Sequence, residues 1–377
     1  MPDTNLETPR LLLDRARLER NAARLRARCA ELGVRFRPHI KTAKSVEVAH
    51  IAHGGGTGGK LTVSTLREAE AMAAAGFRDL LLAATITPAK LPRAAALQRA
   101  HDARLLLLAD DIAMVRLVAA AAEMPFDVLI EIDCGEHRSG IAAGSPALLA
   151  IAAEIARAPN LRLAGVMTHA GHSYATDDID SIAELAETER AAAVTAAGRL
   201  RAAGHGCDIV SVGSTPTLLH ARHLDGVTEA RAGVSLFWDL AQFSRGMCGW
   251  DDLALSVLAT VIGHQHNGPV PSLVLDAGAL ALSKDVSANT FLPEAKNGIL
   301  ADARTGERLP LVVNVLHQEH GTVHVPDETW FARLPVGVVV RVVPNHACLT
   351  AAGGYGFYHV HDGDGRAQAT WPRVDGW

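Results

Sequence analysis

The feature that most restricts the fold is a regular alternation through the first 235 residues. Eight short apolar runs alternate with alanine-rich stretches whose apolar residues recur at helical spacing. Such alternation predicts parallel strands joined by helices, and eight repeats predict a (β/α)8 TIM-type barrel. A doubly wound open sheet is the alternative. The expected strands are residues 34–37, 61–64, 80–84, 105–109, 128–133, 163–169, 209–213 and 228–232.

After about residue 250 the pattern changes. Residues 272–276, 309–315 and 338–343 are rich in β-branched side chains and are bounded by Gly, Pro, Asn or Asp, with no long helical pattern between them. This texture predicts an antiparallel β-domain. Residues 10–13 also read as a strand. We therefore predict a barrel over 14–250 and a β-domain formed by 1–13 together with 251–377.

Composition excludes several classes of protein. The formal net charge is −5 and no basic run stands out, so we expect no nucleic-acid partner. No apolar stretch reaches the roughly 18 residues of a membrane span. The polar, acidic start lacks the apolar core of a secretory signal. Five scattered cysteines argue against a disulfide framework, and together these features predict a cytoplasmic protein.

Reactive side chains follow the predicted strands, as they should in a barrel whose active site lies at the carboxyl ends of its strands. Lys41 follows the first strand beside Pro38, a position from which a lysine could form a Schiff base. A solvated surface lysine is the ordinary alternative. The other candidates after later strands are Glu136, Arg138, His169, His172, Tyr174, Gly213, Ser214, Thr215 and Gly233.

The segment from Gly213 to Thr217 has the composition of a phosphate cradle. A glycine permits close backbone approach, and consecutive amides and hydroxyls bind phosphate oxygens at a strand end. Gly233, after the next strand, could complete the cradle. The alternative is an ordinary Ser/Thr turn.

His346 and Cys348 form a His-x-Cys pair at the end of the last β-rich run. Because strand side chains alternate, we expect both on one face. Imidazole and thiolate together suit Zn²⁺, and two protein ligands would leave positions open for catalysis. A packed cysteine beside a hydrogen-bonded histidine is the alternative.

These pieces are collinear with the motifs of a known family. The sequence resembles the D-threonine aldolase and D-serine dehydratase family of fold-type III pyridoxal-phosphate enzymes, over essentially the whole chain from Thr8 to Trp377. The motifs that carry the resemblance are Thr8-Pro9, Arg37-Pro38-His39-x-Lys41-Thr42, Val63-Ser64-Thr65-x-x-Glu68-Ala69, Glu131-Ile132-Asp133, Arg138-Ser139-Gly140, Gly213-Ser214-Thr215-Pro216-Thr217, Asp276-x-Gly278, Gln318-Glu319-His320-Gly321 and Pro344-Asn345-His346-x-Cys348.

The resemblance implies an alanine-racemase-like architecture and a homodimer with active sites near its interface. It implies pyridoxal 5′-phosphate as cofactor and a divalent metal, zinc first and manganese as the alternative. In residues, it implies that Lys41, rather than Lys44, carries the internal aldimine, that Arg138 faces the pyridine nitrogen, that Gly213, Ser214 and Thr215 hold the phosphate, that Tyr174 lies near the cofactor, and that His346 and Cys348 bind the metal.

Two departures from the family pattern concern the surroundings of the cofactor. Relatives often carry Tyr where this chain has Met167, and many carry Tyr where it has Ser235. We therefore expect the outer contacts of the cofactor to differ here.

The implied parts support two reactions of a D-3-hydroxy amino acid. In a dehydratase, Lys41 takes the α-proton while the metal stabilises the departing hydroxyl, giving an oxo acid and ammonia. In an aldolase, His169 or His172 takes the hydroxyl proton, and the products are glycine and an aldehyde. Cys348 favours dehydration, because aldolases of the family tend to have His-x-Asp and dehydratases His-x-Cys. The segment 257–264 also resembles dehydratases that act on D-serine or D-threo-3-hydroxyaspartate. The aldolase is the main alternative; a racemase or a non-catalytic cofactor carrier is the remaining one.

Overall fold

The computed structural model describes residues 7–377, so the first six residues of the predicted segment 1–13 lie outside the described residues. The chain divides into two compact units. One, called here the barrel unit, contains residues 23–41, 48–233 and 374–377. The other, called the β-unit, contains 7–22, 42–47 and 234–373.

The barrel unit is built on a parallel sheet whose strand order is β2-β10-β9-β8-β6-β5-β4-β3. An isolated bridge between His39 and Thr62 joins the segment after β2 to β3. Because β2 and β3 are the two ends of the strand order, this bridge brings the edges of the sheet together into a barrel. The predicted (β/α)8 barrel is confirmed, and the doubly wound open sheet is wrong. The strands are β2 (Arg35–Phe36), β3 (Lys60–Val63), β4 (Asp79–Leu82), β5 (Arg104–Ala109), β6 (Phe126–Asp133), β8 (Leu161–Thr168), β9 (Ile209–Val212) and β10 (Glu229–Ala230), with the short β7 (Ile141–Ala142) beside β6.

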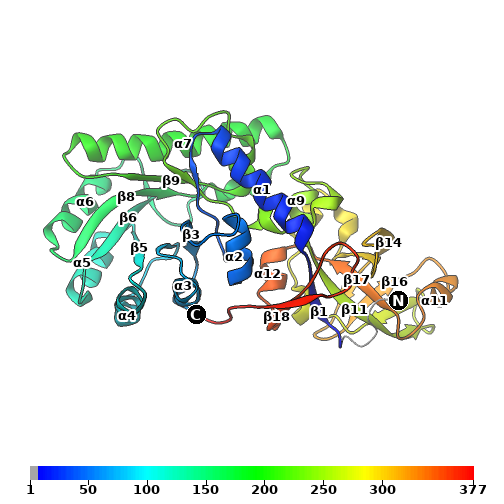
Figure 1. The fold of residues 1–377 in the computed structure, drawn as a ribbon. Coiled ribbons are helices and arrows are strands. Elements are labelled where there is room, and N and C mark those ends of the chain that lie inside the picture. Colours follow the sequence, from blue (N-terminus) through cyan, green and yellow to red (C-terminus); the bar gives the residue numbers. More distant parts are fainter. Residues whose placement is uncertain (1–6) are drawn as a thin grey trace. The chain divides into compact units, whose positions relative to one another are not determined.

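Helices surround these strands, and Figure 1 shows α3 to α7 along the outside of the sheet. Inside, leucines of β4, β5 and β6 pack with Ile209 and with Met167, the position where relatives often carry tyrosine. The helices are α1 (Arg15–Glu31), α2 (Val46–Ala52), α3 (Leu66–Ala74), α4 (Leu91–His101), α5 (Ile112–Ala121), α6 (Ala147–Arg157), α7 (Ile179–Ala202) and α8 (Thr215–His220), with 3-10 turns η1 (Pro88–Lys90) and η2 (Gly171–Ala175).

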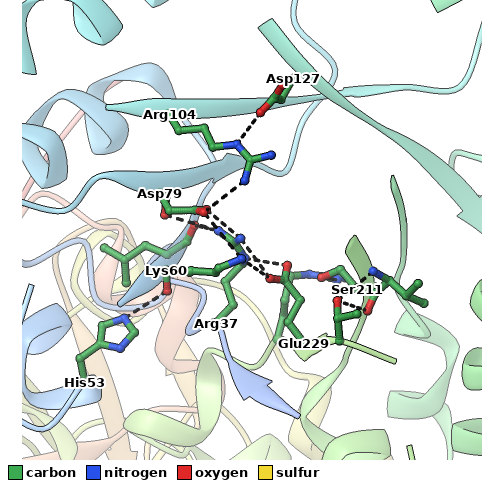
Figure 2. Close-up of polar contacts among 12 residues, drawn as sticks. Arg37, His53, Lys60, Asp79, Arg104, Asp127, Ser211 and Glu229 are labelled. Carbon is green, nitrogen blue, oxygen red and sulfur yellow. Dashed lines mark hydrogen bonds and ion pairs between the residues drawn. The ribbon is translucent and has the colours of Figure 1, made fainter. Parts of the chain in front are cut away.

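A network of charged side chains ties the strand starts together (Figure 2). The fully buried Arg37 forms two hydrogen bonds with Glu229, of 2.7 and 3.1 Å, and an ion pair with Asp79 at 2.8 Å. Lys60 reaches both carboxylates, and Arg104 links Asp79 to Asp127 on β6. Lys60, Asp79, Arg104 and Glu229 are each the first residue of their strand. The network therefore lies at the amino end of the barrel, away from the end where active sites form.

The β-unit contains a sheet in the order β14-β13-β17-β11-β1-β18-β19, with β12, β16 and β15 continuing from β11. Its pairs are antiparallel except β1 with β18, which is parallel. The strands are β1 (Arg10–Asp14), β11 (Leu255–Gln265), β12 (Ser272–Leu275), β13 (Ile299–Asp302), β14 (Arg308–Val312), β15 (Val315–Leu316), β16 (Gly321–His324), β17 (Val339–Val343), β18 (Phe357–His361) and β19 (Ala369–Pro372).

The expected strand at 309–315 is therefore two strands, β14 and β15. The helical elements of the β-unit are short: η3 (Val234–Leu236), α9 (Leu240–Phe243), η4 (Trp250–Asp252), α10 (Ala279–Leu282), η5 (Ser287–Thr290), η6 (Pro293–Ala295), α11 (Thr329–Arg333) and α12 (Ala347–Ala351). The predicted domain limits, 14–250 and 1–13 plus 251–377, stay a prediction. In the compact units, residues 42–47 and 234–250 group with the β-unit. Across residues 7–377, no helix combines the length and apolar character needed to cross a membrane.

Candidate active site

The predicted cofactor residues gather at the carboxyl ends of the barrel strands. Lys41 follows β2, His169 follows β8, Gly213 follows β9 and Gly233 follows β10. Because the strands are parallel, these ends lie at the same rim of the barrel, where such folds place their active sites. Arg138 lies between β6 and β7.

Lys41 has two histidines as electrostatic neighbours. Its backbone amide donates to Nδ1 of His39 at 3.4 Å. Burial holds the pKa of His39 well below its usual value, and the charges of Lys41 and Arg231 lower it further. A neutral His39 is consistent with an Nδ1 that accepts a hydrogen bond. The sequence motif contained His39 but gave no sign that it would be a partner of Lys41.

His169 is also neutral. Burial lowers its pKa to about 3, and Arg231, Lys41 and Arg138 contribute in the same direction. Its Nδ1 lies 2.7 Å from the carbonyl oxygen of Gly213. Since a carbonyl only accepts, Nδ1 carries the proton and Nε2 carries the lone pair. With so low a pKa, His169 is a weak general base near neutral pH.

His172, the other predicted base, lies in η2. Its Nδ1 is buried and has no hydrogen-bond partner among the described residues. A buried ring nitrogen without a partner is costly, and a bound group or water commonly satisfies such an atom. The role of His172 as a base stays a prediction.

The predicted phosphate cradle is organised by hydroxyl groups. Ser214 caps α8 and forms a capping box with Thr217. The amide of Thr215 donates to the hydroxyl of Tyr174 at 3.1 Å, and Ser173 Oγ lies 2.8 Å from Ser214 Oγ. The hydroxyls of Ser173, Tyr174 and Ser214 and the amide of Thr215 thus lie close together. This donor set fits a phosphate group, and the position of Tyr174 near the cofactor stays a prediction.

Gly213 has no room for a side chain. Its φ is +142°, and a Cβ would collide with the backbone of Arg231, the residue after β10. The glycine therefore lets the cradle approach the chain segment that leads to Gly233.

Two arginines differ in their surroundings. The side chain of Arg138 is 56% exposed and pairs with Glu136 at 3.3 Å, so its contact with the pyridine nitrogen stays a prediction. Arg231 is buried; its Nη1 donates to Ser211 Oγ at 2.7 Å and its Nη2 to the carbonyl of Thr168. Burial lowers the pKa of Arg231, while Glu189 and Glu229 oppose the shift. Arg231 was not among the site residues predicted from the sequence.

The expected metal pair is present, but strand alternation does not bring it together. His346 caps α12 and Cys348 is the second residue of that helix, so the expectation that both lie on a strand is wrong. The turn of chain after β17 brings the imidazole and the thiol into a hydrogen bond instead. Asp239 holds the start of α12 by accepting from the amide of Ala347 at 2.8 Å.

Asp285 lies behind His346, with Oδ2 3.0 Å from Nδ1. Burial lowers the pKa of His346, but its hydrogen bonds with Asp285 and Cys348 outweigh burial and raise the pKa to about 11. A carboxylate on Nδ1 leaves Nε2 for a metal, which is the usual arrangement of a metal-binding histidine. Asp285 was not predicted, because it is far from the motif in sequence.

The donor set fits a metal site with open positions. Cys348 Sγ lies 3.0 Å from Thr42 Oγ1, and Thr42 is the residue after Lys41 in the chain. Within residues 7–377, no three His, Cys, Asp or Glu side chains are grouped as metal ligands. A metal ion bound by His346 and Cys348 alone would have open positions for water or substrate, as catalytic zinc sites have in part.

A (β/α)8 barrel with a lysine at a strand end and a second, β-rich unit defines an alanine-racemase-like enzyme of fold-type III. Two family models support this class: "Alanine racemase, N-terminal domain" matches residues 13–240, and "Putative serine dehydratase domain" matches 254–361. The chain belongs to the pyridoxal-phosphate family that combines these two domains.

Curated relatives include both dehydratases and aldolases. The chain is 43% identical to D-threo-3-hydroxyaspartate dehydratase of Delftia sp. (strain HT23), over all of both chains. It is 31% identical to D-serine dehydratase of Dictyostelium discoideum, covering 96% of this chain and 94% of the relative. A 3-hydroxy-D-aspartate aldolase of Paracoccus denitrificans is 28% identical, with 99% and 92% covered.

Solved structures agree with these relatives. The Delftia dehydratase superimposes with a TM-score of 0.92, at 43% identity and 99% coverage of both chains. A cysteine-to-alanine variant of it has been solved in a metal-free form, with the same TM-score. The predicted family, fold and lyase class are confirmed. The metal-free form of the variant implies that the relative can bind a metal.

Proposed function

We propose that this protein is a pyridoxal-phosphate- and metal-dependent dehydratase that converts D-3-hydroxy amino acids, such as D-serine or D-threo-3-hydroxyaspartate, into an oxo acid and ammonia. The observation that carries the proposal is the pairing of His346 with Cys348, backed by Asp285, inside the part of the chain that matches a serine dehydratase domain.

Each group has a distinct task in this reaction. Bound cofactor would acidify the α-hydrogen of the amino acid, and a zinc ion would act as Lewis acid on the 3-hydroxyl. Lys41 would bind the cofactor covalently and then accept the α-proton. The hydroxyls of Ser214 and Tyr174 would orient the cofactor's phosphate. His346 and Cys348 would hold the ion while leaving positions for substrate oxygen.

The state of His169 supports dehydration over retro-aldol cleavage. Cleavage needs a base to take the proton of the 3-hydroxyl, and a histidine with a pKa of about 3 is poorly suited to that. Dehydration needs no such base, because the oxygen leaves as metal-stabilised hydroxide or water. The aldolase alternative therefore depends on His172, whose Nδ1 has no partner among the described residues.

The test is a product assay. The purified protein, loaded with cofactor and Zn²⁺, is incubated with D-serine, D-threonine and D-threo-3-hydroxyaspartate, and ammonia with oxo acid is measured separately from glycine. We expect ammonia and oxo acid as the main products. Glycine and an aldehyde as the main products would overturn the dehydratase and support the aldolase.

We also propose zinc as the native metal, a homodimer and a cytoplasmic location. A nitrogen and sulfur donor pair favours zinc over manganese. All five cysteines are free, which fits a reducing compartment. Metal analysis of the purified protein and light scattering of the eluting species test the first two statements.

A further inference from the structure

Glu189 is the one polar residue on the buried face of α7. The other buried residues of this helix are Ile182, Ala183, Ala186, Ala193, Ala196, Ala197 and Leu200. A carboxyl group in such a position costs free energy unless its hydrogen bonds compensate, and the fold itself would be served by another apolar residue. The position therefore calls for a specific explanation.

The carboxylate joins two loops at the carboxyl ends of β8 and β9. Its Oε1 accepts hydrogen bonds from the amides of Ala170 at 2.9 Å and Gly213 at 3.0 Å. Its Oε2 accepts from Thr217 Oγ1 at 2.7 Å. Burial raises the pKa of Glu189, and these three donors together with Arg231 oppose the shift. Both oxygens thus take part in holding the two loops.

The hydrogen bonds of Glu189 orient the groups that form the cradle. Thr217 gives its only hydroxyl proton to Glu189, so the same oxygen accepts from the amide of Ser214 at 3.1 Å. Gly213 is held at its amide by Glu189 and at its carbonyl by His169. The orientation of the Ser214 backbone and of the His169 ring therefore depends on a residue that lies outside every sequence motif.

We propose that Glu189 is a positioning residue that holds the candidate phosphate cradle in its binding geometry and so sets the affinity for the phosphate group of the cofactor. This inference rests on the proposed function, because it assumes that pyridoxal 5′-phosphate binds at Gly213, Ser214 and Thr215. It assigns no contact between Glu189 and the cofactor itself.

The experiment compares two ligands that differ only in the phosphate. Pyridoxal 5′-phosphate and pyridoxal are titrated into the full-length protein after removal of bound cofactor, and the visible absorbance gives each Kd. In Glu189→Ala we expect the Kd for pyridoxal 5′-phosphate to rise about tenfold to a hundredfold, since the three hydrogen bonds that hold the two loops are lost. The Kd for pyridoxal should change by less than about twofold, within the range of a surface substitution.

Two further variants test the hydrogen bonds that link Glu189 to the cradle. Thr217→Val removes the hydroxyl between Glu189 and Ser214 and should reproduce part of the loss. Glu189→Gln keeps an acceptor for the two amides and should retain most of the affinity. Glu184→Gln, on the exposed side of the same helix, is the matched control and should behave as the wild type. These variants keep the test available if Glu189→Ala does not fold.

The outcomes distinguish a failure of the role of Glu189 from a failure of the proposed function. Equal losses for both ligands, or no loss in a folded Glu189→Ala or Thr217→Val variant, would show that Glu189 only stabilises the fold and would overturn its role. A wild-type protein that binds neither ligand would overturn the proposed function instead.

Discussion

At the scale of single residues, the side chains around Lys41 distinguish it from an ordinary surface lysine, although Lys41 is exposed as surface lysines are. Arg231 and two neutral histidines, His39 and His169, lie within electrostatic range of it. Its place after β2, at a carboxyl end of the barrel strands, is what makes Lys41 the candidate for the covalent bond to the cofactor. Lys44, three residues further, belongs to the β-unit.

Lys41→Ala should therefore abolish the visible absorbance band of the lysine-bound cofactor and the catalytic activity with it. The band arises only when the amine of a lysine is bonded to the cofactor, and alanine cannot form that bond. The measurement is an absorbance spectrum before and after borohydride treatment. Lys44→Ala is the control and should keep both band and activity. The opposite pattern in the two variants would transfer the role to Lys44.

Asp285 should matter for the metal although it is not one of the predicted ligands. It holds Nδ1 of His346, and loss of such an outer partner usually weakens metal binding about tenfold to a hundredfold. Asp285→Asn should therefore raise the Kd for Zn²⁺ by that factor, measured by competition with a chromogenic chelator. Asp327→Asn, an exposed carboxylate of the same unit, should leave the Kd unchanged. Equal zinc affinity in both variants would rule out this role for Asp285.

The metal pair also shows what sequence could and could not predict at this scale. Residue type alone makes His346 and Cys348 only candidates, because imidazole and thiolate suit zinc. The family resemblance is what implies that they bind the metal, and this stays a prediction. Their geometry was misjudged, because the chain starts a helix at Ala347 instead of continuing β17. Asp285 lies 61 residues away in sequence, so only the fold brings it to His346.

At the scale of elements, the strands were predictable because their burial follows a simple pattern. The run from Arg104 to Ala109 is apolar after its first residue, and the structure buries those five positions. By contrast, nothing in the local sequence of α7 marks Glu189 as a link between β8 and β9. Long-range polar contacts of this kind depend on how helices and strands pack, which hydrophobic periodicity does not encode.

In the charged network at the amino end of the barrel, Arg37, just after β2, pairs with Glu229 of β10, and this ion pair stabilises the contact between the two strands. Arg37→Met would leave Glu229, 1% exposed, as a buried charge without its main partner. We expect a loss of about 3–5 kcal/mol in the free energy of unfolding, as for other broken buried ion pairs. The free energy of unfolding is measured by urea denaturation of Arg37→Met, of Glu229→Gln and of the double variant that carries both substitutions.

The double variant should be less destabilised than the sum of the single variants, because it removes the unpaired charge. Arg116→Met provides the control: Arg116 pairs with Glu154 at 3.0 Å on the surface and should change stability little. Additive losses from Arg37 and Glu229 would mean that their ion pair is not what stabilises this end of the barrel.

At the scale of the whole molecule, the two sets of candidate residues belong to different units. The cofactor candidates from Lys41 to Gly233 lie in the barrel unit, whereas His346, Cys348 and Asp285 lie in the β-unit. The candidate ligands of the metal and of the cofactor are thus separate residues, and neither set shares a residue with the other. Removal of one group should leave the binding residues of the other in place.

Chelation should therefore stop turnover without displacing the cofactor. After dialysis against a strong chelator, we expect the absorbance band of the lysine-bound cofactor to persist while ammonia release from a D-3-hydroxy amino acid falls to background. The reason is that the 3-hydroxyl is a poor leaving group without a Lewis acid, whereas the residues proposed to hold the cofactor, Lys41 and the cradle hydroxyls, do not include the proposed metal ligands. Zn²⁺ alone should restore the rate. Dialysis against buffer without chelator is the control, and full activity in protein shown by elemental analysis to be free of metal would remove the catalytic role assigned to His346 and Cys348.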